Sequence, residues 1–181
     1  GDCCLVSWAA YAAWQQSWLT VDEGAMRHIL LGYIAGWSDW AGLPLERDAA
    51  RLTHICYAFA NIKEGEVLLF TEQSKDQSQP RAVEGIAHLR GLRSRHPHLK
   101  LLISIGGWGA EGFSDAALTA SSREQFAASA IRFMHLHGFD GIDLDWEYPA
   151  NDMAGIKARP EDKHNFTLLL AELRRQLNTE S

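Results

Sequence analysis

The chain has 181 residues, of which 46% are hydrophobic and 22% charged, so it is long enough for one globular domain with a buried core. Its net charge of −6 argues against nucleic acid or an anionic membrane as the main partner, and no stretch is apolar enough to span a bilayer. The three cysteines form no Cys-x-x-Cys pair, so we expect neither a cysteine metal site nor a redox motif, and we expect no cofactor.

Residues 1–27 are expected to be an N-terminal extension that precedes the domain. Residues 5–14 resemble the apolar part of a signal peptide, but no basic leader precedes them and the first residue is Gly1. A short amphipathic helix or a disordered extension is therefore predicted here.

Strands and helices are predicted to alternate from residue 28 onward. Residues 28–37 form an apolar run typical of a buried strand, and residues 46–52 a short helix. A second strand is predicted over 54–61. Residues 64–79 are polar and are expected to form a loop with a small hairpin at its start.

The second part of the chain continues this alternation. Pro80 is expected to open a helix that stops near His96, and a strand follows over 100–105. The capping-box pattern from Ser121 to Glu124 predicts the start of a helix that ends at Gly138. The last predicted elements are a strand over 139–146 and a helix from Pro160. Four apolar strands that alternate with helices indicate an α/β fold with a parallel sheet.

Acidic residues alternate along the fourth predicted strand. Because side chains of a strand alternate between faces, Asp143, Asp145 and Glu147 should share one face, roughly 6–7 Å apart per step. The opposite face should carry the apolar residues Ile142, Leu144 and Trp146. Asp140 has the other parity at the start of the strand, which favours a structural role.

Three carboxylates on a poorly solvated strand should raise at least one pKa, as a general acid working near neutral pH requires. A solvated edge strand with acids facing water is one alternative. A site for a hard cation is another, although no histidine lies nearby on the same face and a file of carboxylates converges poorly on one ion.

The acidic segment resembles the signature of glycoside hydrolase family 18, the chitinase family. Its pattern, Asp-x-x-Asp-x-Asp-x-Glu, is matched by Asp140, Asp143, Asp145 and Glu147, and Tyr148-Pro149 follows. The segment Ser104-Ile105-Gly106-Gly107-Trp108 resembles the third-strand motif of the same family. The resemblance extends from about Leu30 to the C-terminus.

The resemblance implies a TIM barrel that hydrolyses chitin with retention of configuration and without an enzyme nucleophile. Glu147 would protonate the glycosidic oxygen and later activate water. Asp145 would orient the N-acetyl group of the substrate, whose oxygen attacks the anomeric carbon, and Asp143 would exchange hydrogen bonding with Asp145. The resemblance also implies secretion.

The same resemblance suggests supporting residues. Tyr33 and Ser104 would hydrogen-bond Asp143; filling of the barrel core is the alternative for each, and for Tyr33 it is nearly as well favoured. Trp108 would stack on a sugar at the aglycon side. Tyr148, Gly106 and Gly107 belong to the matched motifs and complete the expected site, whereas Trp37 and Trp40 are expected to be loop or packing residues.

A TIM barrel needs eight strands and typically about 250 residues, so residues 28–181 are expected to form its N-terminal half. Such a half-barrel leaves two strand edges open and exposes an inner face, expected to carry Tyr33, Tyr57, Phe59 and Trp108. Three hypotheses remain open: a chitin hydrolase that acts alone or through homo-oligomers, a non-catalytic half-barrel that binds chitooligosaccharides, and a fragment that reflects assembly alone.

Overall fold

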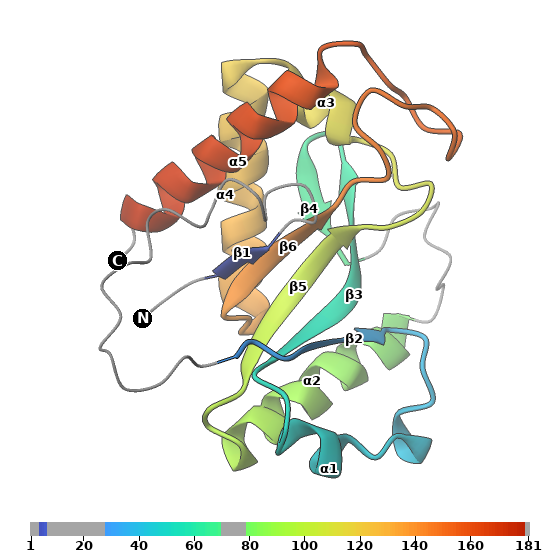
Figure 1. Cartoon of the computed structure of the whole chain (residues 1–181), viewed down its shortest axis with the longest axis vertical. Helices are drawn as coiled ribbons and strands as arrows, with labels where there is room; N and C mark the ends of the chain where they lie inside the picture. Colours follow the sequence, from blue (N-terminus) through green and yellow to red (C-terminus); the bar gives the residue numbers. More distant parts are fainter. Residues whose placement is uncertain (1–3, 7–27, 70–78, 180–181) are drawn as a thin grey trace.

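The computed structural model describes residues 4–6, 28–69 and 79–179, in which a mainly parallel sheet is flanked by helices (Figure 1). The strands are β1 Cys4–Val6, β2 Leu31–Ala35, β3 His54–Lys63, β4 Glu66–Leu68, β5 Lys100–Gly106 and β6 Gly141–Asp145. The helices are η1 Trp40–Gly42, α1 Leu45–Ala49, α2 Gln79–Arg95, α3 Phe113–Leu118, α4 Ala120–His137 and α5 Asp162–Thr179.

The sheet confirms the predicted α/β class with TIM-barrel-type parallel strands. Its strand order is β1-β6-β5-β3-β2, and all neighbours in this path are parallel. The four predicted strands thus lie in sequence order from β2 to β6. The predicted hairpin is also present, because β4 pairs antiparallel with β3 across the turn at Glu64 and Gly65.

Helices cover one face of the sheet in two groups. Helices α1 and α2 lie together beside β2 and β3, and α3, α4 and α5 lie at the opposite end of the molecule (Figure 1). The apolar core fills the space between this layer and the strands, with Ile55, Ile103 and Ile142 fully or almost fully buried. Burial of each such side chain stabilises the fold by about 1.5–3 kcal/mol. The strand residues of the opposite parity therefore form the inner face.

The structure corrects the predicted cap of α4. The residue before the helix is Thr119, whose side chain accepts a hydrogen bond from the Ser122 amide at 3.1 Å, and the Ser122 hydroxyl bonds back to the Thr119 amide. Ser121 and Glu124 are therefore already inside the helix. Gly138 ends it, as predicted, in the left-handed region with φ of 75°.

Two further elements differ from the prediction. Helix α3 lies in a stretch that had no predicted element, because six residues are too few for a periodic apolar pattern. Strand β2 is shorter than the expected run 28–37, since its flanking residues are exposed or turn-forming. No helix within the described part of the chain is long and apolar enough to cross a bilayer.

Strand β1 changes the expected picture of the N-terminal extension. Residues 4–6 form a strand, rather than a helix or a disordered segment, and pair in parallel with Gly141, Ile142 and Asp143 of β6. The rest of the predicted extension lies outside the described residues. The β6 edge, which we expected to be open, is therefore partly covered by β1.

A pair of proline substitutions tests the pairing of β1. Amides of neighbouring strand residues point in opposite directions, so only one of Leu5→Pro and Val6→Pro should remove a hydrogen bond to β6. We expect that one variant to accelerate amide exchange of residues 141–145 about tenfold. Hydrogen–deuterium exchange measures this, with the other variant as the matched control. Equal exchange in both variants and the unchanged chain would contradict the pairing.

Candidate active site

Asp143, Asp145 and Glu147, called the acidic file here, lie along β6 and just past its end, as strand parity predicts. Ile142 and Leu144 are buried in the core on the helix-covered side, together with Trp146 just past the strand. Trp146 stacks on Phe113 with 5.2 Å between ring centroids and meets Phe166 edge-on at 5.4 Å. These contacts fix the backbone on either side of Trp146, and therefore position Asp145 and Glu147.

Asp143 is the buried member of the file, with only 2% of its surface exposed. Its Oδ2 accepts hydrogen bonds from the Tyr33 hydroxyl at 3.0 Å and the Ser104 hydroxyl at 2.7 Å. Burial raises the pKa of Asp143, and the two hydrogen bonds offset part of this shift. The structure thus brings together three predicted site residues from β2, β5 and β6. This burial excludes the solvated edge strand.

Asp145 lies at the end of β6 and is partly buried. Burial raises its pKa to about 6, with further contributions from the negative charges of Glu147 and Asp143. The expected raised pKa is therefore found at Asp145 and Asp143. A carboxyl group with a pKa near 6 can hold or release a proton close to neutral pH, as proton sharing within the file requires.

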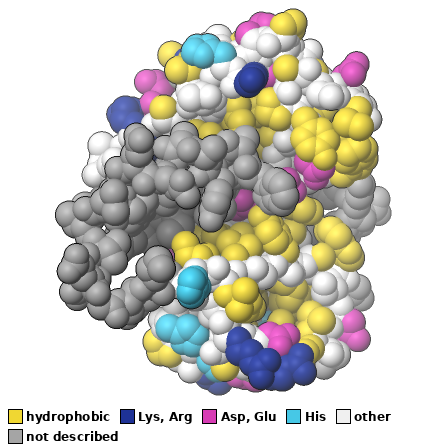
Figure 2. Space-filling model, in the orientation of Figure 1, with side chains coloured by type: hydrophobic (Ala, Val, Ile, Leu, Met, Phe, Trp, Pro, Cys, Tyr) yellow, Lys and Arg dark blue, Asp and Glu magenta, His cyan; other side chains and the backbone are white. Residues whose placement is uncertain are grey.

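Glu147 follows the strand at the carboxyl-terminal edge of the sheet and is partly exposed. The neighbouring Tyr148 is 42% exposed, and hydrogen bonding to the Glu147 carboxylate raises the pKa of its phenol. Trp108, 50% exposed, meets the Tyr148 ring edge-on with centroids 6.3 Å apart. Figure 2 shows hydrophobic side chains gathered over the strands, with acidic groups among them.

The two motif glycines allow the backbone to pass close to the acids. Gly106 has φ of 120°, and a Cβ at this position would lie 2.3 Å from the Asp145 carbonyl oxygen. Gly107 has φ of 92°, and a Cβ there would lie 2.9 Å from the Phe59 ring. Both positions therefore require glycine. The Gly107 amide donates a hydrogen bond to the Asp145 carbonyl at 2.9 Å, which joins the ends of β5 and β6.

Phe59 and Trp37 extend the aromatic surface beyond the predicted site. Their ring centroids are 6.3 Å apart, and Phe59 also lies against Gly107. Trp37 was expected to be a loop or packing residue; its 52% exposure adds an aromatic face beside the acids. The signal in the sequence was one aromatic residue on each of three strand segments, Trp37 just past β2, Phe59 within β3 and Trp108 just past β5.

Tyr57 lies on the opposite face from the one predicted. It is buried in the core and stacks on Trp40, with ring centroids 6.1 Å apart. Regular alternation would place Tyr57 and Phe59 on the same face of β3. The register between β3 and β5 shifts between Ala58 and Ala60, and this irregularity interrupts the alternation between the two residues. The expected packing role of Trp40 agrees with this contact.

Cys56 is a residue that the sequence did not single out. It is fully buried on the inner face, and its register partner on β2 is Tyr33. Burial, and then the negative charge of Asp143, raise the pKa of the thiol, so it is neutral at physiological pH.

Asp140 lies outside the acidic file, as its parity predicts. Its Oδ2 accepts hydrogen bonds from Arg93 Nη1 and from the Leu101 amide, both at 2.9 Å. Asp140 therefore links the start of β6 to α2 and β5. Within residues 4–6, 28–69 and 79–179, no three histidine, cysteine or acidic side chains come together as metal ligands.

The chain matches known proteins over most of its length. The model for glycosyl hydrolases family 18 matches residues 29–181. Chitinase A1 of Niallia circulans is 34% identical over 86% of this chain and 28% of its own length. The structure of chitinase ChiW from Paenibacillus sp. str. FPU-7 has 50% identity and a TM-score of 0.74, over 84% of this chain and 15% of its own.

Human YKL-39, described as a pseudo-chitinase with retained chitooligosaccharide binding, is 28% identical. Its structure has a TM-score of 0.65, over 84% of this chain and 40% of its own. The chain therefore spans well under half the length of each of these proteins.

The raised pKa of Asp145 predicts a pH dependence of stability. Between its unfolded value of 3.8 and its folded value of about 6, the folded chain holds the proton that the unfolded chain releases. The contribution of Asp145 to stability is therefore full below pH 3.8 and is lost as pH rises to about 6. We expect Asp145→Asn to raise the free energy of unfolding, relative to the unchanged chain, by about 1–2 kcal/mol more at pH 7 than at pH 4. The difference stays below the full value of the pKa shift because solvent screens the partly exposed group.

Urea unfolding at pH 4 and pH 7 measures the effect. Asp115→Asn is the control of opposite sign, since hydrogen bonds from Lys157 and Arg159 lower the pKa of Asp115 and its contribution is lost as pH falls. An Asp145→Asn difference that is the same at both pH values would argue against the raised pKa.

Proposed function

Because the chain belongs to glycosyl hydrolases family 18, we propose that it carries the catalytic strand of an enzyme that hydrolyses β-1,4-linked N-acetylglucosamine polymers. The observation that supports this most directly is the file of Asp143, Asp145 and Glu147. Its buried end is held by Tyr33 and Ser104, and its outer end lies at the carboxyl edge of the sheet. TIM-barrel enzymes place their chemistry at this edge.

In the proposed mechanism, Glu147 donates its proton to the glycosidic oxygen as the bond to the anomeric carbon breaks. The N-acetyl carbonyl oxygen of the substrate attacks that carbon and forms a cyclic oxazolinium ion. Glu147, now ionised, takes a proton from water, whose oxygen opens the ring. The product keeps its configuration because the anomeric carbon is attacked twice.

Asp145 would orient the N-acetyl group and stabilise the positive oxazolinium. Its pKa of about 6 supports exchange of a proton with Asp143 during the cycle. Both hydrogen bonds to Asp143 end on Oδ2, which leaves Oδ1 for the proton shared with Asp145. Trp108 and Tyr148 would contact the sugars, since exposed aromatic rings suit the apolar faces of pyranoses.

A second candidate function is chitooligosaccharide binding without turnover. It is favoured by the likeness to human YKL-39, a pseudo-chitinase with retained chitooligosaccharide binding. The β2 edge has no strand partner beyond β3 among the described residues. An apolar cavity of about 440 Å³ lies along β2 and is lined mainly by residues of β2, α1 and their connecting loop.

We also propose that this open side is an interface between copies of the chain. Exposed apolar side chains at Leu30 and Leu43 border the cavity, and their burial would contribute about 25 cal/mol for each Å². Secretion goes with the proposed substrate, since a large polymer of N-acetylglucosamine cannot cross a membrane intact. We propose no nucleic acid or membrane partner.

The proposed acid is tested by Glu147→Gln in an active assembly, such as a completed barrel. The amide has a similar shape but has no proton to donate, so turnover of a fluorogenic chitobioside should fall on the order of 10²–10⁴-fold. Chitotetraose binding, measured by calorimetry, should stay within about twofold. Glu124→Gln on α4, which is exposed and remote from β6, serves as the control. Near-normal turnover by Glu147→Gln would rule out the role of Glu147.

The completeness of the site is tested on the unmodified chain. We expect concentration-dependent self-association in sedimentation, and no turnover by the monomer, because the sheet of the described residues leaves its β2 edge unpaired and the site beside it open. Leu43→Glu, on the rim of the cavity, should weaken association about tenfold or more by placing a charge at the interface. A stable monomer that turns over chitobiosides would contradict both expectations.

A further inference from the structure

Two loops flank the acidic file. Residues 107–112 connect β5 to α3 and carry Trp108, and residues 146–161 connect β6 to α5 and carry Glu147. Near the acids the loops meet through the edge-on contact of Trp108 with Tyr148. The relative position of Trp108 and Glu147 therefore depends on how the two loops are held together.

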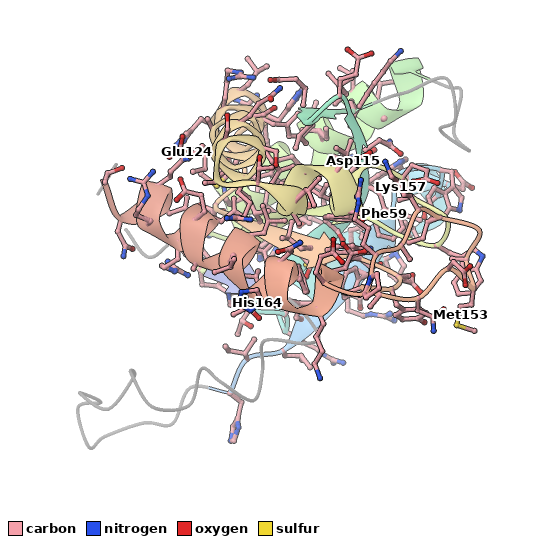
Figure 3. The ribbon with its side chains drawn as sticks, turned by 90° about the horizontal axis from the view of Figure 1, so that it is seen from above. Phe59, Asp115, Glu124, Met153, Lys157 and His164 are labelled. Atoms are coloured by element: carbon pink, nitrogen blue, oxygen red, sulfur yellow. The ribbon has the colours of Figure 1, made fainter. Side chains whose placement is uncertain are left out.

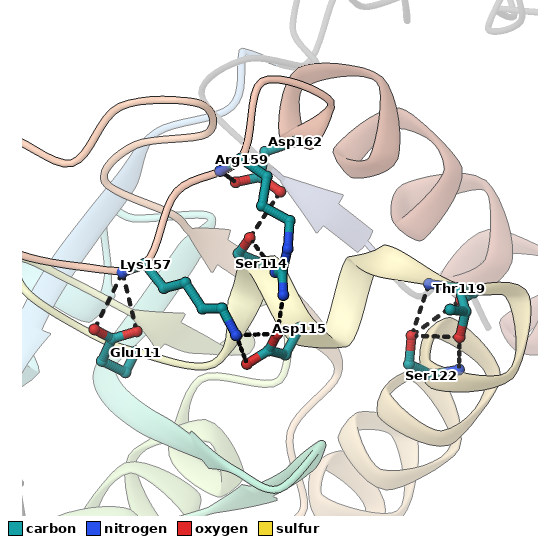
Figure 4. A network of polar contacts seen from close by, with 8 residues as sticks. All are labelled: Glu111, Ser114, Asp115, Thr119, Ser122, Lys157, Arg159 and Asp162. Atoms are coloured by element: carbon teal, nitrogen blue, oxygen red, sulfur yellow. Dashed lines mark hydrogen bonds and ion pairs between the residues drawn. The ribbon is translucent and has the colours of Figure 1, made fainter.

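The far end of the longer loop is fixed by buried polar contacts. Arg159 Nη1 donates to the Ser114 hydroxyl at 2.6 Å, and this hydroxyl donates to Asp162 Oδ1 at 2.9 Å. Asp162 Oδ2 accepts the Arg159 amide at 2.7 Å. Ser114 and Asp162 are 2% and 0% exposed, so water does not compete for these bonds (Figure 4).

An exposed layer extends these contacts. Asp115 accepts Arg159 Nη2 at 2.6 Å and Lys157 Nζ at 2.8 and 3.0 Å, and it lies beside Lys157 in Figure 3. The Lys157 amide donates to Glu111, at 3.1 Å from Oε1 (Figure 4). We call Ser114, Asp115, Lys157, Arg159 and Asp162 the Arg159 network.

Residues 147–153 of the loop have few other anchors, whereas farther along it Ile156 is 5% exposed within the apolar core and Ala154 packs against that core. Backbone hydrogen bonds from Asn151 to Tyr148 and from Gly155 to Asp152 are local, and Met153 is 64% exposed. Helix α5 is held independently by its own apolar stripe, which includes the buried residues Leu169, Leu173 and Leu177. The Arg159 network is therefore not needed to dock α5, and its effect falls on the loop.

We propose that Arg159 is a positioning residue that, through Ser114 and Asp115, fixes the distance between Glu147 and Trp108. It would thus favour oligosaccharides long enough to contact both loops at once. This inference rests on the proposed function, because it assigns the sugar contacts to these two loops. Arg159 touches no substrate in this scheme and acts through the loop backbone.

The experiment compares Arg159→Gln, which removes the guanidinium contacts to Ser114 and Asp115 in both layers, with Asp115→Asn, which weakens only the exposed contacts to Arg159 and Lys157. Arg159→Lys keeps a positive charge for Asp115 but cannot bond Ser114 and Asp115 as a fork. The matched control is Glu172→Gln on α5, which removes an ion pair with the exposed Arg175, away from the loop. All four variants are measured in the full chain.

The first measurement is amide exchange of residues 147–158 without sugar. We expect exchange to become about tenfold faster in Arg159→Gln, less in Asp115→Asn and Arg159→Lys, and unchanged in Glu172→Gln. The second is binding of chitotetraose and chitobiose by calorimetry. Chitotetraose affinity should fall roughly tenfold in Arg159→Gln, with chitobiose affinity within about twofold.

The two measurements separate this inference from the proposed function. Unchanged exchange in Arg159→Gln overturns the positioning role, whatever the sugars do. Faster exchange with an equal loss of affinity for both sugars also overturns it, since length would not matter. If the unchanged chain binds neither sugar, the proposed sugar site fails and the length preference is overturned with it, while the exchange result still decides whether Arg159 fixes the loop.

Discussion

The site depends on one buried carboxyl group. Asp143 sits almost without solvent on the inner face of the sheet, where an unpaired carboxylate would be costly, and two hydroxyl groups supply its hydrogen bonds. These come from Tyr33 on β2 and Ser104 on β5, so the bonds form only if three strands hold the correct relative register. Ser104 is in fact the register partner of Asp143, while Tyr33 reaches across from the far edge of the sheet. The strand register that forms the sheet is therefore also the register that the site needs.

The acids were predictable because strand parity survives along β6, where five residues pair regularly with β5. Parity failed on β3, where the register shift near Phe59 places Tyr57 in the core and leaves Phe59 beside Gly107. Nothing in an apolar run of aromatic and alanine residues signals such a shift. The Arg159 network was not predictable for another reason: most of its contacts join residues more than 40 positions apart, and each residue alone is of an ordinary polar type. The local sequence pattern thus predicts the acidic strand, whereas the contacts that hold the loops are seen only in the folded chain.

Strand β1 shows how the sheet responds to an unfilled edge. It lies outside the residues that the family model matches, yet it pairs in parallel with β6, as the next strand of a barrel would. It reaches only Asp143, so the last two residues of β6, including Asp145, have no partner from β1. The backbone beside the acids is therefore the part of this edge that β1 leaves uncovered.

Gly106 and Gly107 carry no chemistry, but they limit how the sequence can vary as strictly as the acids do. Any side chain at Gly106 would overlap the carbonyl of Asp145, and any at Gly107 would displace Phe59. A population of variants selected only for a folded, soluble chain should therefore already be depleted of substitutions at both positions. Part of the sequence pattern that marks this family is therefore required by the space around the backbone rather than by catalysis. Its presence in a relative does not by itself show that the relative is still a catalyst.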